Sequence, residues 1–291
     1  MTVTIKQALD VAAGELSQSD SPRLDAELLL AHILSVERSH LYAHPKRTLS
    51  CAVCQRFHVL VSRRAQSEPI AYILGEKSFW DLTLKVSSAV LIPRPETELL
   101  VETALDLGAS AKSLRVTDLG TGSGAIALAV GKSRPLWRIT GTDISLDALE
   151  IARKNRETLG LSNVDFQEGS WCDPLPSGSM DIIIANPPYI APEDPYLSLK
   201  ELRYEPVMAL RAELNGYRDL LSIAAQAREK LVSGGWLLLE HGYAQHETLL
   251  ALLRGFGYSG VQGKKDLAGV PRMVQARWPG PISDETPHNL S

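Results

Sequence analysis

Strand-like and helix-like segments alternate through the last two-thirds of the chain. Seven short apolar or β-branched runs are predicted strands, at 114–119, 137–142, 163–167, 181–185, 235–240, 258–263 and 271–277. Five segments have helical patterning, at 96–107, 123–133, 145–159, 217–232 and 244–255. Strands that alternate with helices of about 10–15 residues form a mostly parallel sheet with helices on both faces. We therefore predict an α/β fold with a doubly wound, seven-stranded sheet.

The last two predicted strands are joined only by a short stretch rich in glycine and lysine. A parallel crossover connection needs roughly a dozen residues, usually a helix. We therefore predict that the last strand of this mostly parallel sheet is antiparallel.

The first 67 residues have a different character and predict a small helical bundle. Residues from about 5 to 66 have helical patterning throughout, with Ser21-Pro22 and Ser50 as helix starts. The helix after Ser21 is predicted to bury one stripe with spacings of three and four. This stripe consists of Leu24, Leu28, Ala31 and Leu34.

A connector is predicted between the bundle and the sheet, over residues 68–92. Trp80, Leu82, Leu84 and Val86 alternate with polar residues, which is the period-two pattern of a half-buried strand. We predict a β-hairpin here, an α/β domain over 93–278, and a disordered tail over 279–291, where the chain is polar and rich in proline.

Composition narrows the class of protein. The chain has 291 residues, is 44% hydrophobic and carries a net charge of −4, which is typical of a globular protein and argues against a broad duplex-binding face. No apolar run approaches the ~20 residues of a membrane span, and no signal peptide is predicted. The three cysteines suggest a reducing compartment. We expect a cytoplasmic monomer without a metal site.

A glycine-rich turn follows the first predicted strand of the sheet. Gly120, Gly122 and Gly124 occupy alternate positions before a helix, a pattern that lets a ligand approach the backbone closely. Asp143 ends the next strand, where an acid receives ribose hydroxyls; it could equally cap the helix that follows. These features fit either a dinucleotide or S-adenosylmethionine, since both contain an adenosine ribose.

Asp118 and a second motif separate these two ligands. Asp118 lies inside the glycine-rich turn, where it would repel a pyrophosphate but tolerate a cationic ligand such as S-adenosylmethionine. Hydride transfer also gives no obvious use for the second motif. Trp171, after the third strand, is either a wall for the adenine ring or a packed tryptophan.

The second motif is Asn186-Pro187-Pro188-Tyr189, directly after a buried strand. Two consecutive prolines force a stiff, extended loop at the carboxyl edge of the sheet, where open α/β folds bind ligands. The Asn186 carboxamide offers one acceptor and two donors. Held beside the Tyr189 ring, it suits recognition of a planar NH2 group. No catalytic base is evident beside it, so the pattern favours catalysis by positioning.

These motifs resemble the class I S-adenosylmethionine-dependent methyltransferases that share Asn-Pro-Pro-Tyr. The resemblance narrows to the protein-(glutamine) methyltransferases of peptide-chain release factors, because the stretch from Leu91 to Glu98 reads Leu-Ile-Pro-Arg-Pro-Glu-Thr-Glu. Tyr204-Glu205-Pro206 and Gly234-Gly235 also fit that family, and the likeness extends to about Trp278. One departure lies at 211–217, a stretch that could border the active site.

The resemblance implies roles for individual residues. It implies that the cofactor S-adenosylmethionine packs against the glycine-rich loop. Asp143 would hold the ribose of the cofactor, and Trp171 would lie near its adenine. The loop residues are Gly120, Thr121, Gly122, Ser123 and Gly124. It implies that Asn186 and Pro187, with Pro188 and Tyr189 beside them, receive the glutamine amide of a Gly-Gly-Gln motif in the release factor.

The same motifs allow two other functions. A nucleic-acid amino-methyltransferase would hold a flipped base in the same loop, but the acidic balance and the lack of a basic, aromatic-rich strip argue against direct nucleic-acid binding. A non-catalytic adaptor would retain the fold without the chemistry, and the intact motifs argue against it. Cys51, Cys54 and His58 are interpreted as part of a helix and not as a metal cluster.

Overall fold

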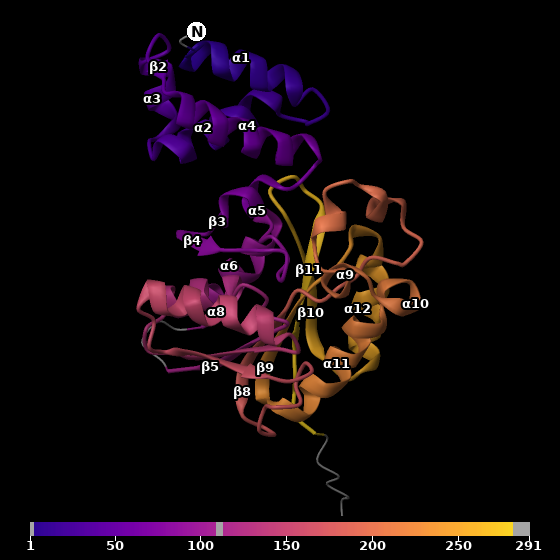
Figure 1. The fold of residues 1–291 in the computed structure, drawn as a ribbon. Helices are drawn as coiled ribbons and strands as arrows, with labels where there is room; N and C mark the ends of the chain where they lie inside the picture. Colours follow the sequence, from indigo (N-terminus) through magenta and orange to yellow (C-terminus); the bar gives the residue numbers. More distant parts are fainter. Residues whose placement is uncertain (1–2, 109–112, 282–291) are drawn as a thin grey trace, which may run out of the picture.

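The computed structural model describes residues 3–108 and 113–281 (Figure 1). The amino-terminal helices form a separate body at one end of the molecule, the hairpin lies beneath them, and the large sheet with its helices forms the rest. The chain therefore passes once from bundle to connector to sheet.

The bundle consists of four helices around its own hydrophobic core. They are α1 (Ile5–Glu15), α2 (Pro22–Leu34), α3 (Arg38–Ala43) and α4 (Cys51–Ala65). Two very short strands, β1 (Val3–Thr4) and β2 (Thr48–Leu49), pair antiparallel at its edge and were not predicted. Ser50 caps α4 as predicted, because its hydroxyl accepts a hydrogen bond from the backbone N–H of Val53.

The predicted apolar stripe of α2 is confirmed only in part, because Ala31 is buried and Leu34 packs against the bundle core but the rest of the buried face was missed. Leu24 is 38% exposed, whereas Ala26, Leu29 and Leu30 are fully buried. The reason is tertiary: α2 packs against both α1 and α4, so its buried face is wider than one stripe and centred elsewhere. Ser21 stands at the cap position, but its hydroxyl donates to the Asp25 carboxylate and caps no backbone N–H.

The connector contains a short helix, α5 (Ile70–Leu74), that was not predicted, followed by a hairpin of β3 (Glu76–Phe79) and β4 (Leu82–Lys85). Leu82 and Leu84 are buried as the alternation predicts. Trp80 is not part of that pattern, since it occupies the turn with a φ of 57° and is 37% exposed.

The large sheet has seven strands in the order β10-β11-β9-β8-β5-β6-β7. Their bounds are β5 (Arg115–Leu119), β6 (Arg138–Asp143), β7 (Val164–Glu168), β8 (Met180–Ala185), β9 (Leu231–Glu240), β10 (Ser259–Lys265) and β11 (Pro271–Arg277). β11 is antiparallel to both of its neighbours, and the other pairs are parallel. The predicted mostly parallel sheet with an antiparallel last strand is confirmed.

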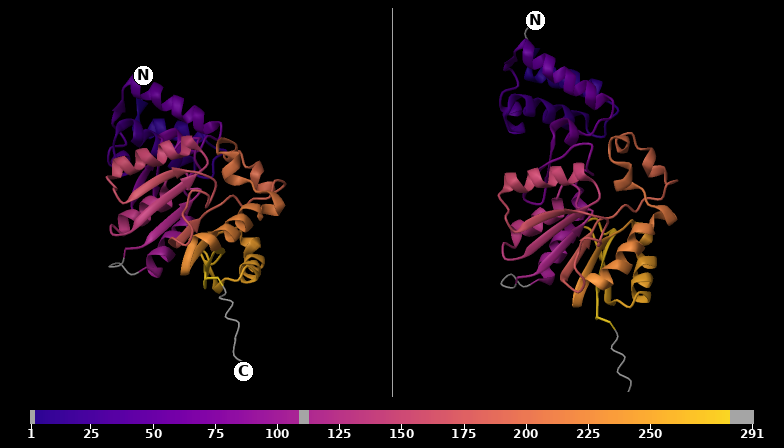
Figure 2. Two further views of the ribbon diagram at one scale, coloured as in Figure 1. Left: turned by 90° about the horizontal axis from the view of Figure 1, so that it is seen from below. Right: turned by 60° about the horizontal axis from the view of Figure 1, so that its bottom comes forward.

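Helices cover both faces of this sheet (Figure 2). One hydrophobic cluster contains residues of α6 (Glu98–Leu107), α7 (Ala125–Ser133) and α8 (Leu146–Leu159). A second contains residues of α11 (Arg218–Lys230) and α12 (His246–Gly255). Each cluster corresponds to one face, which is the doubly wound arrangement that the alternation of strands and helices predicts.

Short helical turns fill the remaining connections. They are η1 (Pro95–Thr97), η2 (Pro195–Ser198), η3 (Leu202–Tyr204), α9 (Val207–Leu210), α10 (Glu213–Gly216) and η4 (Tyr243–Gln245). Of the tail predicted to be disordered, the Pro279 carbonyl accepts a hydrogen bond from Ser233, and residues 282–291 lie outside the described part of the chain.

Candidate active site

The glycine-rich turn joins β5 to α7, and its three glycines have positive φ angles. The values are 67° for Gly120, 55° for Gly122 and 84° for Gly124. A Cβ at Gly120 would lie 3.0 Å from the Trp171 ring, and one at Gly124 would lie 2.9 Å from Leu128, so protein packing explains these two positions. A Cβ at Gly122 would meet nothing within 4 Å. The turn therefore leaves backbone open to a ligand there.

This open backbone faces a cavity of about 420 Å³ at the carboxyl edge of the sheet. The predicted cofactor residues that line it are Gly120, Gly122, Asp143, Trp171 and Asn186. The other predicted cofactor residues are Thr121, Ser123 and Gly124; they do not line the cavity and support the turn from beneath. Thr121 donates to the Asp118 carboxylate, and the Ser123 carbonyl accepts from the Asn155 side chain.

Asp143 ends β6 and points both carboxylate oxygens at backbone donors. Oδ2 accepts from the N–H of Gly122 (2.9 Å) and Oδ1 from the N–H of Ser145 (2.9 Å). Ser145, not Asp143, caps α8, because its hydroxyl accepts from the N–H of Ala148. The helix-cap interpretation of Asp143 is therefore wrong. Burial raises the pKa of Asp143 despite these hydrogen bonds.

Asp118 lies under the turn and is 1% exposed. Its Oδ2 accepts from the Thr121 hydroxyl (2.6 Å) and from the N–H of Ala127 (3.2 Å), while Oδ1 has no hydrogen-bond partner among the described residues. Burial, with a smaller contribution from the charge of Asp143, raises the pKa of Asp118 to about 7. Asp118 does not line the large cavity, so its preference for a cationic ligand over a pyrophosphate stays a prediction, which requires the ionised carboxylate.

Asp118 should make the free energy of unfolding depend on pH. Between pH values of about 4 and 7 the folded chain holds a proton that the unfolded chain releases, so stability falls as pH rises through this window. Asp118→Asn should remove roughly 2–4 kcal/mol of this dependence. It should therefore narrow the difference in stability between pH 5 and pH 8. Urea denaturation of both proteins at pH 5 and pH 8 tests this, and an identical pH dependence would contradict it.

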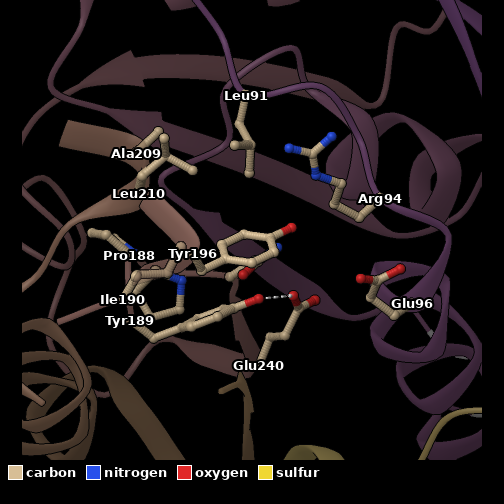
Figure 3. Close-up of a pocket in the computed structure, with 12 residues that line it drawn as sticks. Leu91, Arg94, Glu96, Pro188, Tyr189, Ile190, Tyr196, Ala209, Leu210 and Glu240 are labelled. Carbon is tan, nitrogen blue, oxygen red and sulfur yellow. Dashed lines mark hydrogen bonds between the residues drawn. The ribbon is translucent and has the colours of Figure 1, made fainter. Parts of the chain in front are cut away.

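The Asn-Pro-Pro-Tyr loop leaves the end of β8 and separates two cavities. Asn186 and Pro188 line the large cavity and also a small pocket of about 50 Å³ (Figure 3). Pro187 and Tyr189 line only the small pocket. The loop thus brings together the predicted catalytic residues at a boundary, with room for a cofactor on one side and a small planar group on the other.

The side-chain amide of Asn186 has a defined orientation. Its Nδ2 donates to Thr97 Oγ1 (3.1 Å), and Thr97 is 4% exposed. With the nitrogen turned to Thr97, the Asn186 oxygen is the acceptor available to a ligand. Sequence reasoning assigned no role to Thr97, although it lies in the stretch of residues that carries the family resemblance.

Tyr189 and Glu240 complete the small pocket. The Tyr189 hydroxyl donates to Glu240 Oε1 (3.3 Å), as Figure 3 shows, and burial raises the pKa of Tyr189. Glu240 ends β9 and was also missed; the available signal was an acid at the end of an apolar strand, as with Asp143. Burial raises the pKa of Glu240 to about 7, while the Thr97 hydroxyl beside it acts to lower that pKa.

Arg94 belongs to the stretch that carries the family resemblance, where a guanidinium can either orient the connector or hold the cofactor's carboxylate. Its guanidinium pairs with Glu205 Oε1 (2.5 Å), and Oε2 of the same carboxylate accepts from the N–H of Ile92 (3.2 Å). Arg94 lines the small pocket and not the large cavity. The contacts therefore favour the connector role.

The 211–217 stretch borders the site. Gly216 has a φ of 86°, and a Cβ there would lie 2.1 Å from the Tyr189 carbonyl oxygen, so only glycine fits behind the loop. The Gln245 side chain donates to the same carbonyl (3.2 Å), and Arg211 lines the large cavity. The departure from the family pattern therefore lies in the wall of the site, outside the Asn-Pro-Pro-Tyr motif.

Two family models match separate parts of the chain. A family model described as "PrmC N-terminal domain" matches residues 7–75, and one described as "Methyltransferase small domain" matches residues 95–202. The crystal structure of a methyltransferase from Pyrococcus furiosus is similar, with a TM-score of 0.52 and 21% identity, over 75% of this chain and 98% of that one. At this identity the likeness shows the fold alone.

Curated relatives match nearly the whole chain. The release factor glutamine methyltransferase of Vibrio cholerae serotype O1 is 45% identical over 281 residues, which cover 96% of this chain and 98% of that protein. The release factor glutamine methyltransferase of Coxiella burnetii is 45% identical over 276 residues, or 94% and 99% of the two chains. The chain belongs to the family of release factor glutamine methyltransferases.

Proposed function

We infer that the protein transfers a methyl group from S-adenosylmethionine to the side-chain amide nitrogen of the glutamine in the Gly-Gly-Gln motif of peptide-chain release factors. The observation that carries this inference is the Asn186 amide, which lies between a cofactor-sized cavity and a small pocket with its nitrogen turned to Thr97. The family's curated relatives support the choice of substrate.

The large cavity fits S-adenosylmethionine by its donor and acceptor set. Gly122 leaves room for close approach, Asp143 places carboxylate oxygens for ribose hydroxyls, and Trp171 offers a ring face for adenine. When ionised, the buried Asp118 carboxylate beneath the turn would favour a cationic ligand over a pyrophosphate. The cofactor's sulfonium makes its methyl group electrophilic, which is the part of the chemistry that the protein does not supply.

The protein's part is to position a poor nucleophile. The lone pair of a carboxamide nitrogen is delocalised into the carbonyl. Asn186 Oδ1 and the Pro187 carbonyl are the acceptors that would receive the two amide hydrogens of the glutamine. Held in this way, the nitrogen can turn its lone pair toward the large cavity, and such contacts accelerate the reaction if they strengthen as the nitrogen becomes pyramidal. The new nitrogen–carbon bond replaces the carbon–sulfur bond, and the nitrogen releases one proton to solvent.

Rigidity of the loop contributes to this positioning. Pro187 and Pro188 restrict the backbone before the substrate arrives, so little conformational entropy is lost on binding. Tyr189, anchored on Glu240 and backed by Gly216, is placed to pack on the amide and exclude water.

A third cavity suggests how the release factor reaches the site. It measures about 540 Å³, lies between the bundle and the sheet domain, and shares Arg94, Glu96 and Tyr196 with the small pocket. The wall of this groove is held to the bundle by an ion pair between Arg64 and Glu201 (2.6 Å). We propose that a release-factor loop enters along this groove, with the bundle over 1–67 as docking surface and the connector over 68–92 as its hinge to the domain over 93–278.

Removal of the bundle should separate docking from chemistry. The bundle has its own hydrophobic core, so deleting residues 1–66 leaves both core clusters of the sheet domain in place. Methylation of an intact release factor should fall much more than methylation of a short Gly-Gly-Gln peptide. Steady-state rates with the two substrates measure this, and an equal loss on both would contradict the docking role.

The activity itself is tested by mass spectrometry. A release factor incubated with the protein and S-adenosylmethionine should gain one methyl group on the Gly-Gly-Gln glutamine. Transfer to RNA in place of the release factor, with rates that fall steeply with salt, would support a nucleic-acid methyltransferase and overturn the proposal.

The localisation, oligomeric state and partners of the protein are part of the same proposal. Within residues 3–108 and 113–281, no helix is both long and apolar enough to cross a membrane. A cytoplasmic monomer that binds no nucleic acid directly remains our expectation.

A further inference from the structure

Glu240 is a buried acid with no assigned role, at the wall of the small pocket. It is 1% exposed, and its Oε1 accepts from the Tyr189 hydroxyl. Its Oε2 has no hydrogen bond of good geometry within the described part of the chain. A buried carboxylate left in this state is costly, so a site that retains one calls for an explanation in terms of its neighbours.

The Thr97 hydroxyl lies beside the Glu240 carboxyl. The Thr97 hydroxyl is close enough to act to lower the pKa of Glu240, and Thr97 is buried too, at 4% exposed. A hydroxyl has one hydrogen, and Glu240 in its ionised form, which predominates above a pH of about 7, can only accept. If the Thr97 hydrogen points to Glu240, the Thr97 oxygen can only accept from Asn186, which is what the structure shows.

This chain of contacts gives the Asn186 amide one direction. We propose that Glu240 and Thr97 are positioning residues, which hold the Asn186 nitrogen away from the substrate and leave Asn186 Oδ1 facing the reacting amide. A flipped Asn186 would present an NH2 group to the NH2 group of glutamine, and neither could accept from the other. The inference rests on the proposed function, because it specifies how that site holds its substrate.

Variants at Glu240 and Thr97 separate the effect of hydrogen-bond direction from the effect of side-chain shape. Glu240→Gln keeps the size of the side chain but adds an NH2 group that can donate to Thr97, so the Thr97 hydrogen is free to turn toward Asn186. Thr97→Val removes the hydroxyl at constant shape, and Thr97→Ser keeps it. We expect Glu240→Gln and Thr97→Val to lower kcat on the order of tenfold to a hundredfold, with unchanged affinity for S-adenosylmethionine. Thr97→Ser should restore most of kcat.

The double variant tests whether the two residues act as one unit. Glu240→Gln with Thr97→Val should be no slower than either single variant, because each change already releases the Asn186 amide. Wild-type kcat in Glu240→Gln, multiplication of the two losses, or failure of Thr97→Ser to rescue would each overturn the proposal. Melting temperatures of all variants identify a loss that comes from unfolding alone, which would also count against it.

A second readout does not depend on turnover. In the ligand-free protein, the side-chain NH2 resonances of Asn186 should shift in Glu240→Gln and in Thr97→Val but stay near the wild-type position in Thr97→Ser. Unchanged resonances in Glu240→Gln would refute the orientation. Wild-type protein that fails to methylate a release factor would instead refute the proposed function, so the two failures are distinguishable.

Discussion

Asn186→Ala is expected to lower the rate of methyl transfer by at least about a hundredfold, because it removes the acceptor that aims the glutamine nitrogen. Affinity for S-adenosylmethionine should change little, since Asp143, Gly122 and Trp171 remain in the large cavity. Single-turnover rates and calorimetric titration of the cofactor measure the two effects separately.

Asn186→Asp is the matched control for this change. It keeps the shape of the side chain but replaces the Nδ2 donor with an oxygen. This oxygen could bond to Thr97 only by accepting the hydroxyl hydrogen, which in the wild type points to Glu240. We therefore expect it to be impaired as well; because Asp also adds a negative charge, this result would show that the shape of the side chain alone is not sufficient. Near-normal turnover in Asn186→Ala would end the positioning mechanism.

Asp143→Ala is expected to have the reverse signature. The loss of charged hydrogen bonds to the ribose should weaken cofactor binding by roughly 1.5–3 kcal/mol, or about tenfold to a hundredfold in the dissociation constant. The rate at saturating cofactor should fall less, because the Asn-Pro-Pro-Tyr loop is untouched. Calorimetric titration with S-adenosylmethionine gives the dissociation constant directly.

Asp147→Ala provides the control for charge and position. Asp147 lies in the first turn of α8, carries the same charge, is exposed and does not line the large cavity. Its substitution should leave the dissociation constant unchanged. Equal weakening in both variants would mean that Asp143 acts through the general field of the site and not through contact with the ribose.

Much of the α/β domain could be predicted because its signals are local. The seven strands begin and end within a few residues of their predicted bounds, apart from an earlier start of β9 at Leu231. Strand and helix periodicities repeat over the whole domain, and the short link before β11 left only an antiparallel pairing. The glycine-rich turn, Asp143 and the Asn-Pro-Pro-Tyr loop meet at one edge because parallel strands all end there.

The wrong or missed predictions concern residues whose burial or hydrogen bonds depend on contacts with distant parts of the chain. The buried face of α2 depends on two neighbouring helices, and the apolar spacing within α2 alone identified only part of that face. Trp80 continues the period-two pattern of the connector but lies in its turn. Thr97 and Asn186 are 89 positions apart, so no local pattern could reveal that they are hydrogen-bonded or that Glu240 lies beside them.

The most direct test of the central claim is a crystal structure with S-adenosylhomocysteine bound. We expect the sulfur in the large cavity, on the side of Asn186 away from the small pocket, with Asn186 Oδ1 turned toward the gap between them and Nδ2 still on Thr97. A sulfur bound elsewhere, or an Asn186 side chain that points into solvent away from it, would contradict the account.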